Sequence, residues 1–430
     1  MIILIEQANQ ILWAIATAMI VLSGLYFTKK LKGVQFRFPS MIYHLFEKEE
    51  KQGGISPVQT LMMSLAGRIG VGSIAGVALA IYIGGVGSIF WMWIIALITG
   101  ANTFVETVLG VKYKEKDEGR IYVGGPSYYL KNALHKPCLG KIYAILIIMS
   151  YIIGFLGIQS NTIARSCQEM FSISPWMIGL VIVFLSGVII FGGVKKIADV
   201  TSKLVPIMTL VYVVTATFIV VMNIRMIPTI FIQILKQAFR FDAFFSAFLP
   251  TFIVGIQRGL FSNEAGIGTG SIVTSATDSN NAKKQGYLQV LGIYVTTFLI
   301  CTSTAMIILT SDYASFTSID MNGIELTQHA FHYHLGSFGT TIVFLSILLF
   351  SFSTILTGYY YGESSLKYIL GKVHSRELIL LKSFTLLFLL LGSILSSNTL
   401  WKIVDIFVAL LAIINTYAIL KLQKVVEKET

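Results

Sequence analysis

Two glycine-rich stretches decide the fold of this chain. Residues 66–76 read AGRIGVGSIAG, and residues 255–268 read GIQRGLFSNEAGIG. Each stretch lies inside a long apolar segment and combines several glycines with an arginine and small hydroxyl residues. Because a glycine weakens a helix by up to about 1 kcal/mol relative to alanine, several glycines close together predict that each helix is interrupted.

The segments around these stretches are typical of a membrane protein. Hydrophobic residues make up 55% of the 430 residues and charged residues only 12%, whereas an average soluble domain carries about 25% charged residues. A spanning helix needs about 20 mostly apolar residues. We therefore expect an all-α polytopic membrane protein with about 11 transmembrane helices, at 8–27, 57–84, 86–110, 141–160, 175–194, 201–224, 242–266, 286–310, 339–363, 378–396 and 401–420.

Lysines and arginines are unevenly divided between the loops, and the formal net charge is +11. With 11 spans, 25 of the 32 basic residues fall in the loops of one side and five in those of the other, while Arg68 and Arg258 lie inside spans. Loops rich in lysine and arginine face the cytoplasm. We expect a plasma-membrane protein whose N-terminus is outside and whose C-terminus is cytoplasmic, with no clustered basic patch for nucleic acid.

The two glycine-rich spans occupy matching places in the chain. Without the first span, the other ten form two sets of five, and a glycine-rich span leads each set. Because five is odd, the second set enters the membrane from the opposite side, so the sets form an inverted repeat. The expected order begins with an extra N-terminal helix and a basic cytoplasmic connector (1–53), followed by a first five-helix repeat (54–224) and an external linker (225–241). A second five-helix repeat (242–421) and a cytoplasmic tail (422–430) complete the chain.

An interrupted membrane helix has a chemical consequence. Its free N–H and C=O groups survive only against protein or a watery cavity, because lipid cannot bond to them. Free amides suit a carboxylate, and free carbonyl groups suit Na⁺ or an ammonium group, so paired interruptions in two halves indicate a transporter's binding site. The alternative is close packing of helices through small residues. The matching positions favour the binding site.

Five strings in the chain resemble the alanine/glycine:cation symporter family, also called the sodium:alanine symporters. The matches run in the family's order from about residue 54 to 371 and comprise Gly70–Ala78, Phe90–Trp93, Gly124–Tyr129, Arg258–Gly266 and Ser353–Leu356 leading to Tyr360–Glu363. The resemblance implies a leucine-transporter-like (LeuT-like) 5+5 inverted repeat with one extra N-terminal helix. It also implies Na⁺- or H⁺-coupled uptake of a small neutral amino acid.

The same resemblance implies particular site residues. Substrate contacts would fall on Gly70, Gly72, Ser73, Gln159, Phe261, Ser262, Gly266, Thr354 and Gly358. Cation contacts would fall on Ser73, Ser262, Asn263 and Thr354. The chain departs from the family at Ser73, where the family has asparagine, and at Gly358, where alanine-type members have tryptophan. A glycine there would leave room for a larger substrate such as glutamine.

Three charged residues lie in or near the interrupted spans. Charges inside a membrane are costly and are usually paired or functional. For Arg68, Arg258 and Glu264 we favour a gating or structural role over contact with substrate, and the interruption could bring Arg258 and Glu264 together.

Other function classes fit the chain less well. We find no nucleophile–base pair and no phosphate-binding Gly-Lys-Ser/Thr string, so we expect neither an enzyme nor ATP-driven transport. We expect no cofactor and no metal other than sodium. A channel or a receptor that binds an amino acid without moving it stays open as an alternative. So do proton coupling, the identity of the amino acid and the oligomeric state.

Overall fold

Ten helical segments are long and apolar enough to cross a membrane within the residues that the computed structural model describes, which are 2–47, 54–117, 121–313, 315 and 323–429. Their helices are α1 (Ile2–Lys30), α3 (Pro57–Arg68), α4 (Val71–Gly84), α5 (Ser88–Lys112), α7 (Pro137–Ile148), α8 (Leu156–Phe171), α10 (Gly193–Met222), α11 (Ile227–Ala238), α12 (Leu249–Asn263), α14 (Ala282–Tyr294), α15 (Thr302–Leu309), α17 (Gly323–Leu370), α18 (Ser375–Ile394) and α19 (Ser397–Lys421). Gly336, with φ of 58°, divides α17 into two helices.

One of the eleven expected spans, 175–194, is a shorter helix in the structure. It forms α9 (Pro175–Ile190), which is apolar but has only 16 residues. At about 1.5 Å per residue such a helix covers about 24 Å, less than the hydrocarbon core of a bilayer. The helix is shorter than the expected span because the chain turns at Gly193, which has φ of 76°. This turn ends α9 early and starts α10 eight residues before the expected span at 201.

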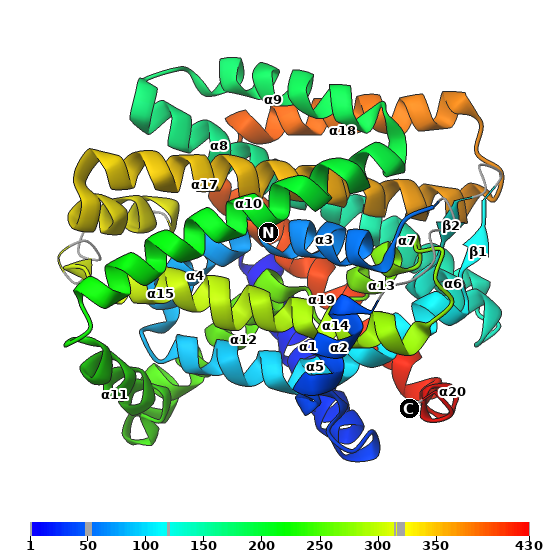
Figure 1. Cartoon of the computed structure of the whole chain (residues 1–430), viewed down its shortest axis with the longest axis horizontal. Helices are drawn as coiled ribbons and strands as arrows, with labels where there is room; N and C mark the ends of the chain where they lie inside the picture. The colour runs from blue at the N-terminus through cyan, green and yellow to red at the C-terminus, as the bar shows by residue number, and fades with distance from the viewer. Residues whose placement is uncertain (1, 48–53, 118–120, 314, 316–322, 430) are drawn as a thin grey trace.

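The long helices run across the view in Figure 1, so the connecting segments gather at its two ends. The right-hand end carries β1 (Glu115–Lys116), β2 (Tyr122–Val123), α6 (Pro126–Asn132) and α20 (Gln423–Glu427). We call it the basic end, because many of the lysine-rich segments lie there. The left-hand end carries α11 and the beginning of α17, and we call it the α11 end.

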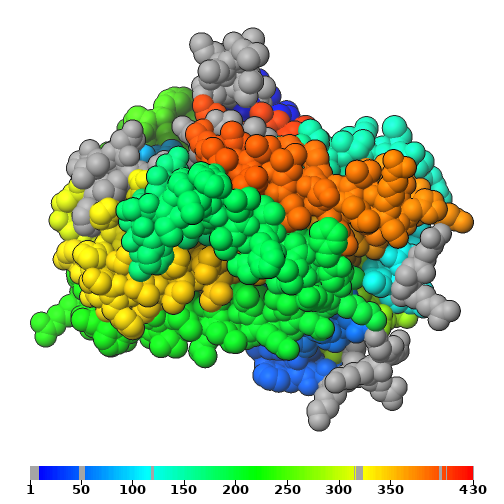
Figure 2. All heavy atoms as spheres, turned by 90° about the horizontal axis from the view of Figure 1, so that it is seen from above, coloured from blue at the N-terminus to red at the C-terminus, as the bar shows by residue number. Residues whose placement is uncertain are grey.

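Large apolar side chains cover the outer surface of the helices. The face in Figure 2 is formed mainly by α18, drawn orange, and by α9 and α10, drawn green. Exposed apolar side chains on these helices include Leu180, Phe184, Leu210, Phe218, Leu380 and Phe384. A soluble monomer rarely exposes so large a continuous apolar surface. The protein is therefore a multi-pass membrane protein.

The helix contacts show the expected two-fold relation between two sets of five. The first set is α3–α4, α5, α7–α8, α9 and α10, and the second is α12–α13, α14–α15, α17, α18 and α19, with α13 at Thr269–Thr274. Contacts of one set recur with the roles exchanged: α10 packs on α15 and α17, while α19 packs on α5 and α8. In the same way α9 contacts α17, and α18 contacts α8. This exchange is what an inverted repeat predicts, although the residue limits drawn for the two repeats stay predictions.

Two spanning helices contain a wide π-helical turn. These turns are η2 (Met149–Phe155), between α7 and α8, and η5 (Val295–Cys301), between α14 and α15. Single π turns inside α-helices are rare and occur often at functional sites. Shorter connecting turns are 3₁₀-helices η1 (Val34–Phe36) and η3 (Phe241–Ala243) and the π turn η4 (Phe244–Phe248).

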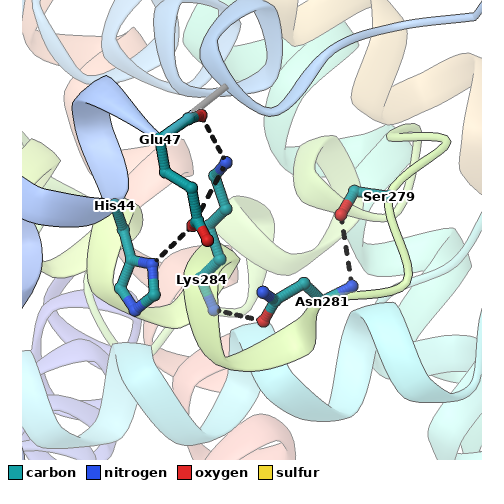
Figure 3. Close-up of polar contacts among 5 residues, drawn as sticks. All are labelled: His44, Glu47, Ser279, Asn281 and Lys284. Carbon is teal, nitrogen blue, oxygen red and sulfur yellow. Dashed lines mark hydrogen bonds and ion pairs between the residues drawn. The ribbon is translucent and has the colours of Figure 1, made fainter. Parts of the chain in front are cut away.

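The connector after α1 is a short helix, α2 (Phe38–Phe46), held against the beginning of α14. Figure 3 shows the cluster that joins them. His44 Nδ1 lies 2.8 Å from Glu47 Oε2, and the Lys284 ammonium lies 3.4 Å from the same oxygen. The Lys284 ammonium also donates to the Glu47 carbonyl group, and the Lys284 N–H donates to Asn281 Oδ1, which caps α14. Residues 48–53 of the expected connector lie outside the described residues.

Acid should release α2 from α14. The hydrogen bond from His44, and then the charge of Lys284, hold the pKa of the Glu47 carboxyl group below its ordinary value of 4.5. The stabilising contact is therefore complete above that ordinary value and is lost as the pH falls through the lowered pKa. Hydrogen–deuterium exchange of residues 38–47 should show this loss of protection.

Glu47→Gln should produce the same loss at neutral pH, because the amide carries no charge. Glu115→Gln, which removes an exposed ion pair with Lys131 at the same end, is the matched control and should leave α2 protected. Equal protection of α2 in the wild type and in Glu47→Gln would show that the cluster does not hold this helix.

Candidate functional site

The first break separates α3 from α4 at Ile69 and Gly70. The N–H of Val71, which has no partner inside α4, donates to Gln159 Oε1 on α8 at 3.1 Å. Gly70 has no room for a side chain, because a Cβ would overlap Thr354 Oγ1 and lie 3.1 Å from Gln159 Oε1. Three segments that are distant in sequence thus meet at this break.

The second break separates α12 from α13 over residues 264–268. Glu264 adopts the left-handed conformation with φ of 52°, and Gly266 and Gly268 have φ of 77° and 101°. The expected span 242–266 ended too early, because the helix resumes as α13. Gly255 and Gly259 do not interrupt α12. Their missing side chains let α12 approach α5, which is the close packing considered above.

The two breaks touch each other. The hydroxyl groups of Ser73 in α4 and Ser262 in α12 are 2.9 Å apart, and Ser262 Oγ lies 3.0 Å from the thiol of Cys301 in η5. A Cβ on Gly72 would lie 3.0 Å from the ring of Phe261. Gly70, Gly72, Ser73, Gln159, Phe261, Ser262 and Thr354 therefore come together, as the sequence predicts.

Four oxygen atoms form a cradle beside the first break. The Thr354 hydroxyl group donates to the carbonyl groups of Ala66, at 2.7 Å, and Phe350, at 2.9 Å. The hydroxyl group of Ser353 lies 3.4 Å and 2.9 Å from the same two carbonyl oxygens. Carbonyl and hydroxyl oxygens suit a hard cation, and a cation would replace the hydroxyl protons as the partner of the carbonyl groups. Ser353 was not among the expected contacts, and the structure places it in this cradle.

Aromatic rings close the site on the side of α8 and α19. The rings of Phe155 and Phe261 stack at 4.4 Å, and Trp401 lies 4.5 Å from Phe261. Gly358 does not face open space, because a Cβ there would lie 2.6 Å from Leu156 Cδ2. Leu156 therefore occupies room that the glycine was expected to leave for the substrate.

Known proteins resemble this chain over most or all of its length. The family model described as the sodium:alanine symporter family matches residues 1–430. The chain belongs to the sodium:alanine symporter family. One relative is the probable sodium/glutamine symporter GlnT of Bacillus subtilis, 37% identical over 97% of this chain and 88% of that protein. Another is the sodium/alanine symporter AgcS of Methanococcus maripaludis, 33% identical over 99% of this chain and 96% of that protein.

Solved structures support the fold of this family member. A Na⁺-coupled sialic acid symporter aligns with a TM-score of 0.52 at 14% identity, over 97% of this chain and 82% of that chain. The manganese transporter of Eremococcus coleocola aligns with a TM-score of 0.54 at 12% identity, over 81% of this chain and 72% of that chain. These likenesses concern the fold alone.

Arg258 in this symporter pairs with an aspartate rather than with Glu264. Its guanidinium lies 2.9 Å from Asp405 Oδ2 on α19 and 4.8 Å from the ring of Trp401. The pair lines a cavity of about 360 Å³ at the α11 end, together with the beginning of α17 and residues such as Arg165 and Glu325. The pair thus stands between this cavity and the breaks. Nothing in the sequence marked Asp405.

Glu264 and Arg68 lie toward the basic end instead. The carboxylate of Glu264 accepts hydrogen bonds from the hydroxyl groups of Tyr151, Thr269 and Tyr361, at 2.7, 2.8 and 3.0 Å. Arg68 donates to the carbonyl group of Gln289 at 3.1 Å, and its strongest attraction is to Glu264. Both side chains are buried and touch protein groups, which fits a structural or gating role.

Two of the expected contacts point away from the meeting place of the breaks. Asn263 Oδ1 accepts the N–H of Ala265 at 3.0 Å and so caps the end of α12. The carbonyl group of Gly266 accepts from Asn415 at 2.9 Å, and its Cα faces Ile20 of α1. The roles of these two residues as cation and substrate contacts stay predictions.

Gly70→Ala should disable the site, because its methyl group would collide with Thr354 at the cradle. Gly76→Ala is the matched control in α4, since the nearest atom to its Cβ is a carbonyl oxygen 4.0 Å away. The control should fold as well or better, by up to about 1 kcal/mol, because alanine favours a helix. Thermal unfolding of the purified variants with and without Na⁺ should show stabilisation by the ion in Gly76→Ala and little in Gly70→Ala. Equal stabilisation by Na⁺ would place the ion elsewhere.

Proposed function

We propose that this chain is a secondary active transporter that couples entry of a neutral amino acid to entry of Na⁺ by alternating access. The observation that carries the proposal is the cradle of Ala66, Phe350, Ser353 and Thr354 oxygens. The cradle joins α3 of the first five-helix set to α17 of the second. An ion bound there would favour the state in which the two five-helix sets are in contact over the state in which they are apart. Coupled transport requires that the ion binds one of these states more tightly than the other.

The substrate carboxylate would bind at the beginning of α4. Free amides at the N-terminus of a half-helix attract an anion. Gln159 strengthens this expectation, because its Oε1 already accepts from Val71 while its buried Nε2 has no hydrogen-bond partner among the described residues. That N–H group can donate to a carboxylate oxygen. The substrate ammonium would then face the hydroxyl groups of Ser73 and Ser262.

The substrate side chain would lie between the aromatic rings and α17. Leu156 against Gly358 limits the space there, which favours an amino acid of the alanine class. A larger substrate such as glutamine is the second candidate, because the family includes a relative named for sodium and glutamine. A change of the Leu156 side chain to another staggered rotamer would enlarge the site.

The basic end would face the cytoplasm, which places the N-terminus outside and the C-terminus inside the plasma membrane. The support is the distribution of lysine and arginine, with 25 of 32 in the loops of one side when α9 is counted as a crossing helix. The cavity lined by Arg258 and Asp405 would then open to the outside.

Uptake into proteoliposomes tests the function. An inward Na⁺ gradient should drive accumulation of radiolabelled alanine, and unlabelled alanine should compete better than glutamine. Leu156→Ala should shift the preference toward glutamine, whereas Leu386→Ala, on the distant α18 face, should not. Flux without a Na⁺ gradient would indicate a channel, and binding without accumulation would indicate a receptor.

Removal of the cradle hydroxyl groups should weaken Na⁺ binding selectively. Ser353→Ala and Thr354→Val should each raise the Na⁺ concentration for half-maximal uptake by about tenfold, equivalent to about 1.4 kcal/mol per lost ligand. Thr357→Ala is the matched control, because Thr357 bonds to the Met63 carbonyl group one turn away from the break. If Thr357→Ala has the larger effect, the ion does not lie in this cradle.

A further inference from the structure

Glu106 on α5 is a fully buried carboxyl group to which the proposed transport cycle gives no role. It lies beside the second break, toward the basic end. Asn415 of α19 donates to Glu106 Oε2 at 2.7 Å, and the same amide nitrogen donates to the carbonyl group of Gly266 at 2.9 Å. Glu106 Oε1 has no hydrogen-bond partner among the described residues.

The charges around Glu106 do not balance. Arg68 attracts two buried carboxyl groups, Glu264 and Glu106. If both were ionised, the three groups would carry one net negative charge inside the membrane, where an uncompensated charge is costly. One bound proton makes the set of Arg68, Glu264 and Glu106 neutral, and either Glu264 or Glu106 must hold it.

The hydrogen bonds distinguish the two carboxyl groups. Glu264 accepts from three hydroxyl groups, which is how a buried carboxylate is stabilised. Glu106 accepts from one side-chain amide and keeps one oxygen unpartnered, which suits the neutral acid. The charges of Arg68 and Glu264 then cancel each other without Glu106.

We propose that Glu106 is a proton-binding site of the transport cycle. The proton is held on Oε1 while the basic end is closed. When that end opens, the O–H bond breaks, the proton passes to water, and the carboxylate stays hydrated. Closure takes a proton back from water at the same end. The step needs no oxidant or reductant, and it makes closure of the basic end depend on pH.

A sodium ion fits this position less well than a proton does. A sodium ion needs several oxygen atoms around it. The hydrogen-bond partner of Glu106 is a donor, the amide of Asn415, and the nearest influence of opposite charge is Arg68. A donor and a positive charge both repel a metal cation.

The groups around Glu106 come from several elements. Its titratable or charged neighbours are Arg68 on α3, Glu264 at the second break, Tyr129 on α6 and Tyr143 on α7. α19 contributes the neutral Asn415, and α1 and α14 pack on α5 with Ile20 and Gly286. Tyr129 also donates to Asn415, and Tyr143 donates to the Ile267 carbonyl group at 2.6 Å. These bonds connect α5 and the second break to α6, α7 and α19. When α6, α7 and α19 separate from α5 and the second break, water can reach Glu106.

Infrared spectroscopy tests the proton directly. In pH-difference spectra the purified wild type should show the carbonyl stretch of a protonated carboxyl group, and this band should disappear on alkalinisation. Glu106→Gln should lack the band. Glu106→Asp should shift the band to a different frequency, and a shifted band shows that the loss in Glu106→Gln does not come from misfolding. Glu363→Gln is the matched control, because Glu363 is buried but paired with Lys367 at 2.9 Å. It should keep the band.

Transport supplies a second readout. Once Glu106 is mostly ionised, wild-type uptake should fall by up to about tenfold for each further pH unit, as for a single required proton. Glu106→Gln should transport with little dependence on pH, because its amide is neutral throughout. A band that persists in Glu106→Gln, or identical pH profiles for the two proteins, would overturn the proposal. The step of the cycle at which Glu106 releases its proton rests on the proposed symport. The infrared measurement tests proton binding by Glu106 even if the protein shows no transport.

Discussion

The requirement that every backbone group inside a bilayer finds a partner governs this structure. Two helices stop and restart in the membrane, and each leaves N–H and C=O groups that lipid cannot satisfy. Gln159 meets the free amide of Val71, and hydroxyl groups of α17 meet the carbonyl group of Ala66. At the second break Tyr143 and Asn415 meet the carbonyl groups of Ile267 and Gly266. The partners come from several helices, so the breaks hold the bundle together while they form its site.

The two ends of the molecule are closed in different ways. At the α11 end the ion pair of Arg258 with Asp405 lines the cavity. At the basic end the closure consists of several bonds from neutral donors, among them those of Tyr143, Tyr151 and Asn415. Only 10% and 12% of the Arg258 and Asp405 side chains are exposed, so loss of one partner would leave a buried charge without compensation. Opening the α11 end therefore separates two charges, whereas opening the basic end breaks several hydrogen bonds from neutral donors.

Much of this arrangement could be predicted from the sequence, and the parts that could not have a common cause. Glycine content, apolar length and the positions of lysine and arginine are local properties, and they indicated the two breaks and the two sets of five helices. Asp405 opposite Arg258, Leu156 against Gly358 and the hydroxyl partners of Glu264 depend on contacts between residues that are far apart in the chain. Ser353 adjoins the expected Thr354, and its place in the cradle follows only from the direction in which its side chain points. The packing role of Gly255 and Gly259 likewise needs the neighbouring helix.

The π turns η2 and η5 add a further property to the helices beside the breaks. Tyr151 in η2 reaches Glu264, and Cys301 in η5 reaches Ser262. A π turn holds one residue more than an α turn, and each residue of a helix corresponds to a rotation of about 100°. If the wide turn shifts along by one residue, different side chains face the break while the helix axis stays in place. These two helices can therefore change their contacts by twisting about their own axes, in addition to any tilting of the bundle.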